Sequence, residues 1–80
     1  MNEAAISARL IEALSLAAAE AAGAPAPIIS VSVEFVSPGD VANVKTRIER
    51  KTRTLVFTGA EAFDADGARI ASATAVHKIG

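Results

Sequence analysis

The feature that most constrains the fold of this chain is a segment of about twenty residues, Glu3–Ala22, that is apolar nearly all the way round. Its residues are good or acceptable helix formers, and alanine dominates. Apolar residues at helical spacing form one stripe: Ile6, Leu10, Leu14, Ala17 and Ala21. Three further apolar residues widen this stripe: Ile11, Ala18 and Ala22. Gly23 and the Ala-Pro-Ala-Pro that follows predict the end of the helix. A helix this apolar needs other elements to cover most of its faces.

After the helix, the pattern changes to strands separated by turns. Apolar and polar residues alternate in three segments, as in half-buried strands: Ile28–Val36, Val41–Arg50 and Arg69–Ile79. A fourth segment, Thr54–Phe63, begins with the apolar run Leu55, Val56 and Phe57 and is also predicted as a strand. The sequence therefore predicts an α+β domain in which one long helix packs on a four-stranded antiparallel sheet. The last segment places Ala71, Ala73 and Ala75 on one face, which favours a sheet that curls closely around the helix.

Length and charge limit the function. The 80 residues leave room for one domain, residues 1–80. A chain of this size buries only about 60% of the surface that it exposes when unfolded, so we expect a homodimer or a higher homo-oligomer. No cysteine is present, and the net charge of −1 argues against nucleic acid or a membrane as partner. Glu3 stands where a signal peptide would be basic, so we expect a cytoplasmic protein.

Glu12 is a carboxylate in the middle of the apolar helix. If apolar side chains surround it, the carboxylate is desolvated and becomes a stronger base, which suits general-base or nucleophilic catalysis. The alternative is structural: Glu12 pairs with Arg9 or reaches solvent at a seam between two copies. The residues alone leave both hypotheses open.

Three stretches together carry a family resemblance: ISARLIEALSLAAA (6–19), VSVEFVSPGDV (31–41) and EAFDADGARIASATA (61–75). They resemble the central helix, the strand with a Phe-x-x-Pro turn and the Asp-Gly hairpin of hot-dog fold acyl-CoA thioesterases related to the phenylacetate-pathway and 4-hydroxybenzoyl-CoA enzymes. The resemblance implies a central helix wrapped by the sheet and hydrolysis of a small-molecule acyl thioester. It also implies no cofactor, since coenzyme A enters as part of the substrate.

The resemblance also assigns site residues. It places Glu12 where the family has its catalytic acid, as general base or nucleophile, and it makes the backbone N–H of Ala4 or Ala5 the oxyanion donor. Glu3, Ala4 and Ala5 replace the family's His-Gly-Gly, and the strand that precedes the helix in the family has no counterpart in this sequence. A second hypothesis therefore stays open: an inactive hot-dog module that binds an acyl ligand or serves dimerisation. In either case the resemblance implies that strand 28–36 pairs with its own copy.

A basic run follows in the second strand and its turn. The resemblance makes Arg50, Lys51 and Arg53 candidates for binding the phosphates of coenzyme A. The alternative is a solvated edge strand with one unpaired side, whose charges discourage pairing with other sheets. Nucleic acid is a poorer partner, because no aromatic residue interleaves with these charges.

The remaining candidates are weaker. His77 is the only histidine, and without cysteine or a carboxylate cluster it makes a poor metal ligand, so we expect no metal site and a histidine on the surface. Asp64–Gly67 has two of the acidic residues of a calcium loop but lacks the later ligands, and we expect a hairpin turn there.

Overall fold

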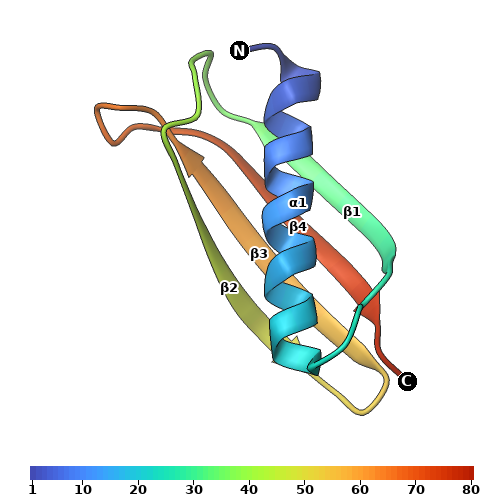
Figure 1. The fold of residues 1–80 in the computed structure, drawn as a ribbon. Coiled ribbons are helices and arrows are strands. Elements are labelled where there is room, and N and C mark those ends of the chain that lie inside the picture. Colours follow the sequence, from blue (N-terminus) through green and yellow to red (C-terminus); the bar gives the residue numbers. More distant parts are fainter.

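The computed structural model describes residues 1–80 and contains one helix followed by four strands (Figure 1). These are α1 (Glu3–Ala22), β1 (Ile28–Phe35), β2 (Asn43–Lys51), β3 (Leu55–Phe63) and β4 (Arg69–Lys78). The strands form one antiparallel sheet in the order β1-β4-β3-β2. The predicted α+β class, the helix and the four strands are confirmed, with strand ends shifted by at most two residues.

Both ends of α1 follow ordinary capping chemistry. The side chain of Asn2 accepts a hydrogen bond from the N–H of Ala5 at 2.8 Å, which satisfies one free donor of the first turn. At the other end, Gly23 takes a left-handed conformation with φ of 70°, and its N–H donates to the carbonyl of Ala19. The helix therefore stops where the glycine allows, before the proline-containing segment.

The helix lies along one face of the sheet, which we call the helix-facing face (Figure 1). The core joins three large side chains of α1 to alanines of β3 and β4 and to Ile70 of β4, and its members are Ile6, Leu10, Leu14, Ala60, Ala62, Ile70, Ala71, Ala73 and Ala75. Because alanine has no atoms beyond Cβ, the helix and the sheet can approach closely. The prediction that Ala71, Ala73 and Ala75 share the face toward the helix is confirmed.

The sheet covers only one side of α1. Ala17 and Ala21, predicted in the apolar stripe, are half-buried, and Ala18 takes the fully buried position next to them. On the opposite side Leu16 is 60% exposed. The expectation of a helix covered on most faces is therefore not met within one chain.

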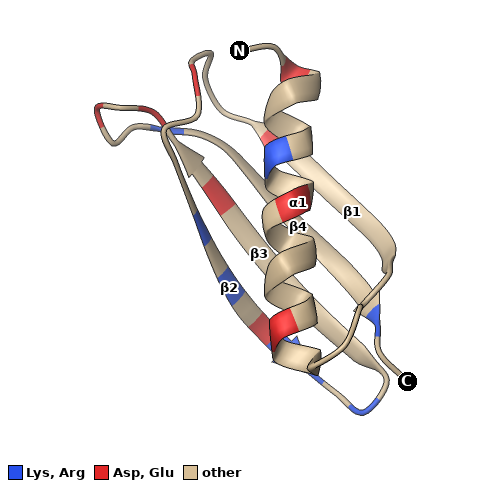
Figure 2. Ribbon diagram, viewed as in Figure 1, with Lys and Arg blue, Asp and Glu red and all other residues tan.

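The two edge strands differ in character. β1 leaves large apolar side chains exposed, among them Ile29, Val31 and Phe35, and a β-bulge falls at Ile29. On the other edge, β2 carries most of the charge of the sheet (Figure 2). The prediction that the second strand has an unpaired side is confirmed for the single chain.

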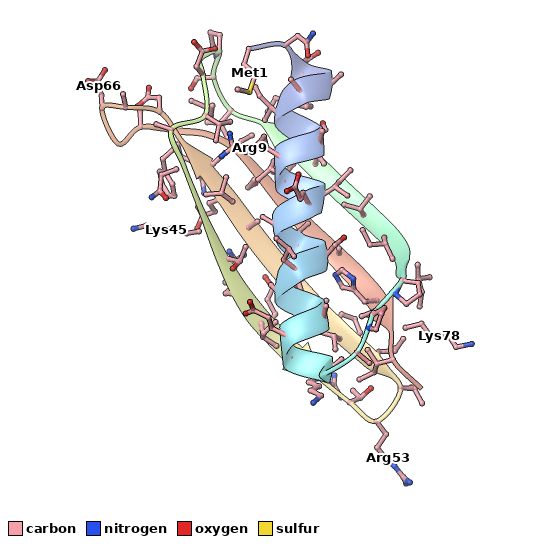
Figure 3. All side chains as sticks on the ribbon, in the orientation of Figure 1. Met1, Arg9, Lys45, Arg53, Asp66 and Lys78 are labelled. Carbon is pink, nitrogen blue, oxygen red and sulfur yellow. The ribbon has the colours of Figure 1, made fainter.

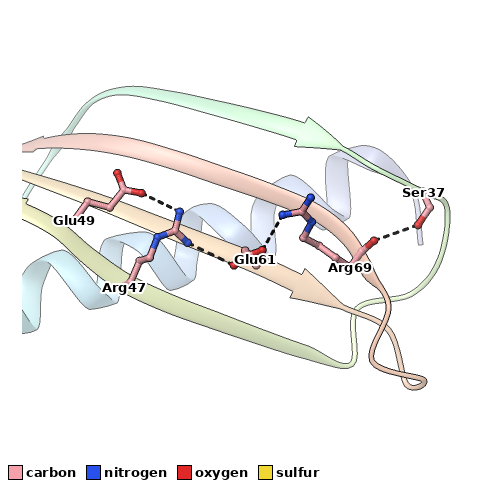
Figure 4. Close-up of polar contacts among 5 residues, drawn as sticks. All are labelled: Ser37, Arg47, Glu49, Glu61 and Arg69. Atoms are coloured by element: carbon pink, nitrogen blue, oxygen red, sulfur yellow. Dashed lines mark hydrogen bonds and ion pairs between the residues drawn. The ribbon is translucent and has the colours of Figure 1, made fainter.

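On the face away from the helix, charged side chains cross three strands. Arg47 of β2 forms two ion pairs: its Nη2 lies 2.9 Å from Glu49 Oε1, and its Nη1 lies 3.7 Å from Oε1 of Glu61 in β3 (Figure 4). The other carboxylate oxygen of Glu61, Oε2, accepts a 3.0 Å hydrogen bond from Nη1 of Arg69 in β4. The guanidinium of Arg47 lies over Gly59, where an added Cβ would come within 2.6 Å of Arg47 Cζ. These pairs are largely exposed, so each contributes at most about 1 kcal/mol.

The hairpin expected at Asp64–Gly67 is also present. The Asp64 side chain accepts hydrogen bonds from the N–H groups of Asp66 and Ala68, both at 2.9 Å. Gly67 has φ of 84°, a conformation that glycine adopts without strain. The carboxylate of Asp64 therefore serves the turn.

Candidate functional site

The N-terminal turn of α1 carries the two proposed oxyanion donors. The N–H of Ala5 is taken up by the Asn2 side chain, and the N–H of Ile6 begins the helix ladder by donating to the Asn2 carbonyl at 3.0 Å. Ala4 precedes the first hydrogen bond of that ladder, so its N–H has no acceptor within the chain. Of the two candidates, Ala4 is the one whose N–H can serve a ligand in this conformation.

A cavity lies beside this turn. It has a volume of about 520 Å³, and α1 and the end of β1 supply its walls: Met1, Asn2, Glu3, Ile6, Phe35, Val36, Ser37 and Pro38. The amino group of Met1 pairs with Asp40 across the same end of the molecule. The helix turn that contains Ala4 therefore borders a partly apolar cavity, although Ala4 itself is not among its lining residues.

Glu12 lies on the side of α1 away from the sheet and is exposed. The expectation that apolar neighbours bury it is therefore wrong for the single chain, because the sheet packs on the opposite side of the helix. Of the structural alternative, the pair with Arg9 is not found, since no ion pair joins Glu12 to Arg9. Glu12 does reach solvent in the single chain, and its place at a seam between two copies stays a prediction.

Glu12 nevertheless lines a cleft. The cleft measures about 420 Å³ and runs between α1 and the segment that follows the helix, with Glu12, Ser15, Leu16, Ala19, Pro25, Ala26 and Pro27 in its walls. Glu12 is the only ionisable side chain among them. The cleft was not predicted, because it depends on how the segment 24–27 folds back beside the helix.

Ala4 and Glu12 are well separated within one chain. Eight residues of α-helix at 1.5 Å each place them about 12 Å apart along the axis. A base and an oxyanion donor must both approach one carbonyl group to within about 3 Å. One chain therefore does not bring these two groups to the same substrate atom.

The three basic candidates lie near the C-terminal end of α1. Lys51 Nζ donates a 2.8 Å hydrogen bond to the carbonyl of Ala21, which stabilises the last turn of the helix. Arg50 and Arg53 are exposed and form no ion pair. Figure 3 shows Arg53 at the end of the molecule opposite Met1. Arg50 and Arg53 are thus available to a ligand, whereas Lys51 already has a structural partner.

His77 is not where the sequence analysis placed it. The prediction of a surface histidine is wrong, since His77 is fully buried. Its ring nitrogens lie 2.8 Å from Thr58 Oγ1 and 3.1 Å from the carbonyl oxygen of Ala26. The strand alternation contained the signal, because residue 77 continues the series of Ala71, Ala73 and Ala75 on the helix-facing face.

Comparison with solved structures identifies the fold. A protein of the thioesterase superfamily superposes with a TM-score of 0.88 at 22% identity, over 100% of this chain and 62% of that one. A Bacillus halodurans protein solved with CoA superposes with a TM-score of 0.84 at 17% identity, over 98% of this chain and 55% of that one. A Pseudomonas aeruginosa protein superposes with a TM-score of 0.58 at 19% identity, over 68% of this chain and 43% of that one. The chain has the hot-dog fold, and it spans about three-fifths of the length of the first two proteins.

The family follows from the sequence match. Residues 9–78 match the family model described as the acyl-CoA thioesterase N-terminal domain, and this chain belongs to that family. A search of curated proteins found no match. The one helix of this chain does not combine the length and the hydropathy that crossing a membrane requires.

Proposed function

We propose that this domain hydrolyses acyl-CoA thioesters, with Glu12 as general base or nucleophile. The observation that carries the proposal is the position of Glu12 as the one ionisable side chain in an otherwise largely apolar cleft of about 420 Å³, in a chain of the acyl-CoA thioesterase family. An apolar cleft suits an acyl chain, and a carboxylate at its wall suits attack on the thioester carbonyl.

Two routes through Glu12 complete the reaction. As a general base, the Glu12 carboxylate takes a proton from water while the water oxygen attacks the carbonyl carbon; the C–S bond then breaks, and the thiolate takes up that proton. As a nucleophile, the carboxylate itself attacks and expels the thiolate, forming a mixed anhydride that water hydrolyses. Both routes release a carboxylic acid and free coenzyme A. In both, an N–H donor stabilises the oxyanion that forms on the carbonyl oxygen.

A homodimer supplies the donor that one chain cannot bring to Glu12. If two β1 edges pair antiparallel about a two-fold axis normal to the sheet, the two α1 helices also run antiparallel on the same face. Suppose that the two-fold axis passes beside the midpoint between Ala4 and Glu12, about 6 Å along the helix from each residue. The Ala4 N–H of one chain then has the same height along the helix axis as Glu12 of the partner chain. The exposed apolar side chains of β1 support this interface. Arg50 and Arg53 remain candidates for the coenzyme A phosphates.

The test is steady-state hydrolysis of a panel of short, long and aromatic acyl-CoAs by the purified protein. Replacing Glu12 with Gln keeps the side-chain shape and removes the base, so we expect turnover to fall by about 100-fold or more. Glu20→Gln is the matched control, since Glu20 is an exposed carboxylate on the same helix outside the cleft. Wild-type turnover that survives Glu12→Gln would contradict the proposed role of Glu12.

A second function, a non-catalytic acyl-binding or dimerisation module, is favoured by one observation. Ala4 and Ala5 have a Cβ where the family has glycine, and the N–H of Ala5 is already capped by Asn2. The non-hydrolysable thioether S-decyl-CoA separates the two functions. Binding of this probe without turnover of any acyl-CoA would favour the binding module, whereas turnover that depends on Glu12 would exclude it.

A further inference from the structure

The segment Ala24–Pro27, which forms one wall of the Glu12 cleft, is held by the end of β4. His77 Nδ1 lies 3.1 Å from the carbonyl oxygen of Ala26, and the N–H of Lys78 donates to the carbonyl of Pro27 at 2.9 Å. Neither Pro25 nor Pro27 has an N–H to donate, so the segment can form few hydrogen bonds of its own. The position of this wall therefore depends on β4.

The partners of His77 determine which ring nitrogen carries the proton. The Ala26 carbonyl can only accept, so Nδ1 is the protonated nitrogen and donates to it. In the neutral ring, Nε2 then has a lone pair and accepts from the hydroxyl of Thr58, whose Oγ1 lies 2.8 Å away. The result is a relay in which the Thr58 hydroxyl of β3 donates to His77 of β4, and His77 donates to the wall segment.

The burial of these groups makes the relay specific. Thr58 and His77 are both fully buried, and His77 takes the place next to three alanines on the helix-facing face. An apolar side chain at position 77 would pack against the helix but could not donate a hydrogen bond to the Ala26 carbonyl. Loss of one partner would leave a buried polar group without a hydrogen bond, which is costly.

We propose that His77 is a positioning residue for the cleft. Through Thr58 and Ala26 it fixes the distance between the Pro25–Pro27 wall and the α1 residues Leu16 and Glu12, and so sets the length and width of acyl chain that the cleft accepts. The assignment of acyl specificity rests on the proposed function; the control of the wall by His77 does not.

The first test is NMR spectroscopy on the free protein. Long-range ¹H–¹⁵N spectra at pH 8 should show His77 in the Nδ1–H form, and the Nε2–H form would overturn the relay.

Thr58→Val keeps the side-chain shape and removes the hydroxyl, whereas Thr58→Ser keeps the hydroxyl and serves as the control. We expect Thr58→Val and His77→Phe to shift the resonances of Ala26, Ala19 and the Leu16 methyl groups, and Thr58→Ser to leave them nearly unchanged. Unchanged cleft resonances in folded Thr58→Val and His77→Phe would also overturn the proposal.

The second test measures ligand preference. With S-decyl-CoA as probe, Thr58→Val should weaken binding about 5- to 10-fold, and Thr58→Ser less than 2-fold. In turnover assays Thr58→Val should raise KM in a way that depends on acyl length, with kcat within about 2-fold, whereas a merely structural role would reduce the folded fraction and leave KM unchanged. If the wild type neither binds the probe nor turns over acyl-CoAs, the proposed function fails, and the NMR test still decides the role of His77.

Discussion

A lysine in place of Val31 tests the proposed dimer interface. Val31 lies on the edge strand β1 and is 38% exposed in the single chain. Fully burying a valine is worth about 1.5–3 kcal/mol, so burying this remaining third contributes about 0.5–1 kcal/mol in each chain and about 1–2 kcal/mol in a symmetric dimer. Val31→Lys removes that term and adds the cost of desolvating an ammonium group.

The combined loss should raise the dimer dissociation constant by roughly 10-fold or more, since about 1.4 kcal/mol corresponds to a factor of ten. Sedimentation equilibrium over a concentration series from below 1 to about 100 μM would measure it. Ile48→Lys is the matched control, because Ile48 is 42% exposed on the opposite edge strand, β2. A wild-type protein that stays monomeric throughout, or a dimer weakened by Ile48→Lys and not by Val31→Lys, would refute pairing through β1.

Three further predictions concern the edge strand β2, Glu12 and Lys51. Amides of β2 that point away from β3 should exchange with solvent fast at alternate positions in the dimer; uniformly slow exchange by hydrogen-exchange mass spectrometry or NMR would mean that another element covers this edge. Glu12→Gln should change the urea-derived free energy of unfolding by no more than about 0.5 kcal/mol, because Glu12 is exposed and unpaired, and a loss of several kcal/mol would reveal a buried partner. Lys51→Met should lower the free energy of unfolding, measured by thermal denaturation, by about 0.3–1 kcal/mol, because the hydrogen bond to the Ala21 carbonyl is lost. Arg53→Met should leave this free energy unchanged.

The elements of this fold could be predicted because each has a local signal. The spacing of Ile6, Leu10 and Leu14 defines the helix, Gly23 ends it, and the alternation around Ala73 gives the face of β4 toward the helix. The prediction for His77 failed because residue type outweighed its place in that alternation. A buried histidine needs hydrogen-bond partners, and Thr58 and Ala26 come together only in the folded chain.

The site was less predictable than the fold. The resemblance pointed to Glu12 and Ala4, but the apolar composition of the helix says only that it needs cover, not which side the sheet takes. The cleft wall formed by Pro25–Pro27 depends on the tertiary fold of a turn, which no periodicity encodes. The proposal that Ala4 and Glu12 act in one site from different chains rests on their separation along α1, which the resemblance alone does not give.

The uneven spacing of large side chains along α1 has a mechanical consequence. Residues 3–14 of the helix pack Ile6, Leu10 and Leu14 against the sheet, whereas residues 15–22 are anchored chiefly by Ala18 in a small cluster with Ala26 and Val56. The free-energy cost of separating a helix from a sheet rises with the apolar area that is uncovered, so residues 15–22 can tilt away from the sheet at a lower cost than residues 3–14. The cleft beside Leu16 and Ala19 lies along residues 15–22, where a small tilt of the helix costs least.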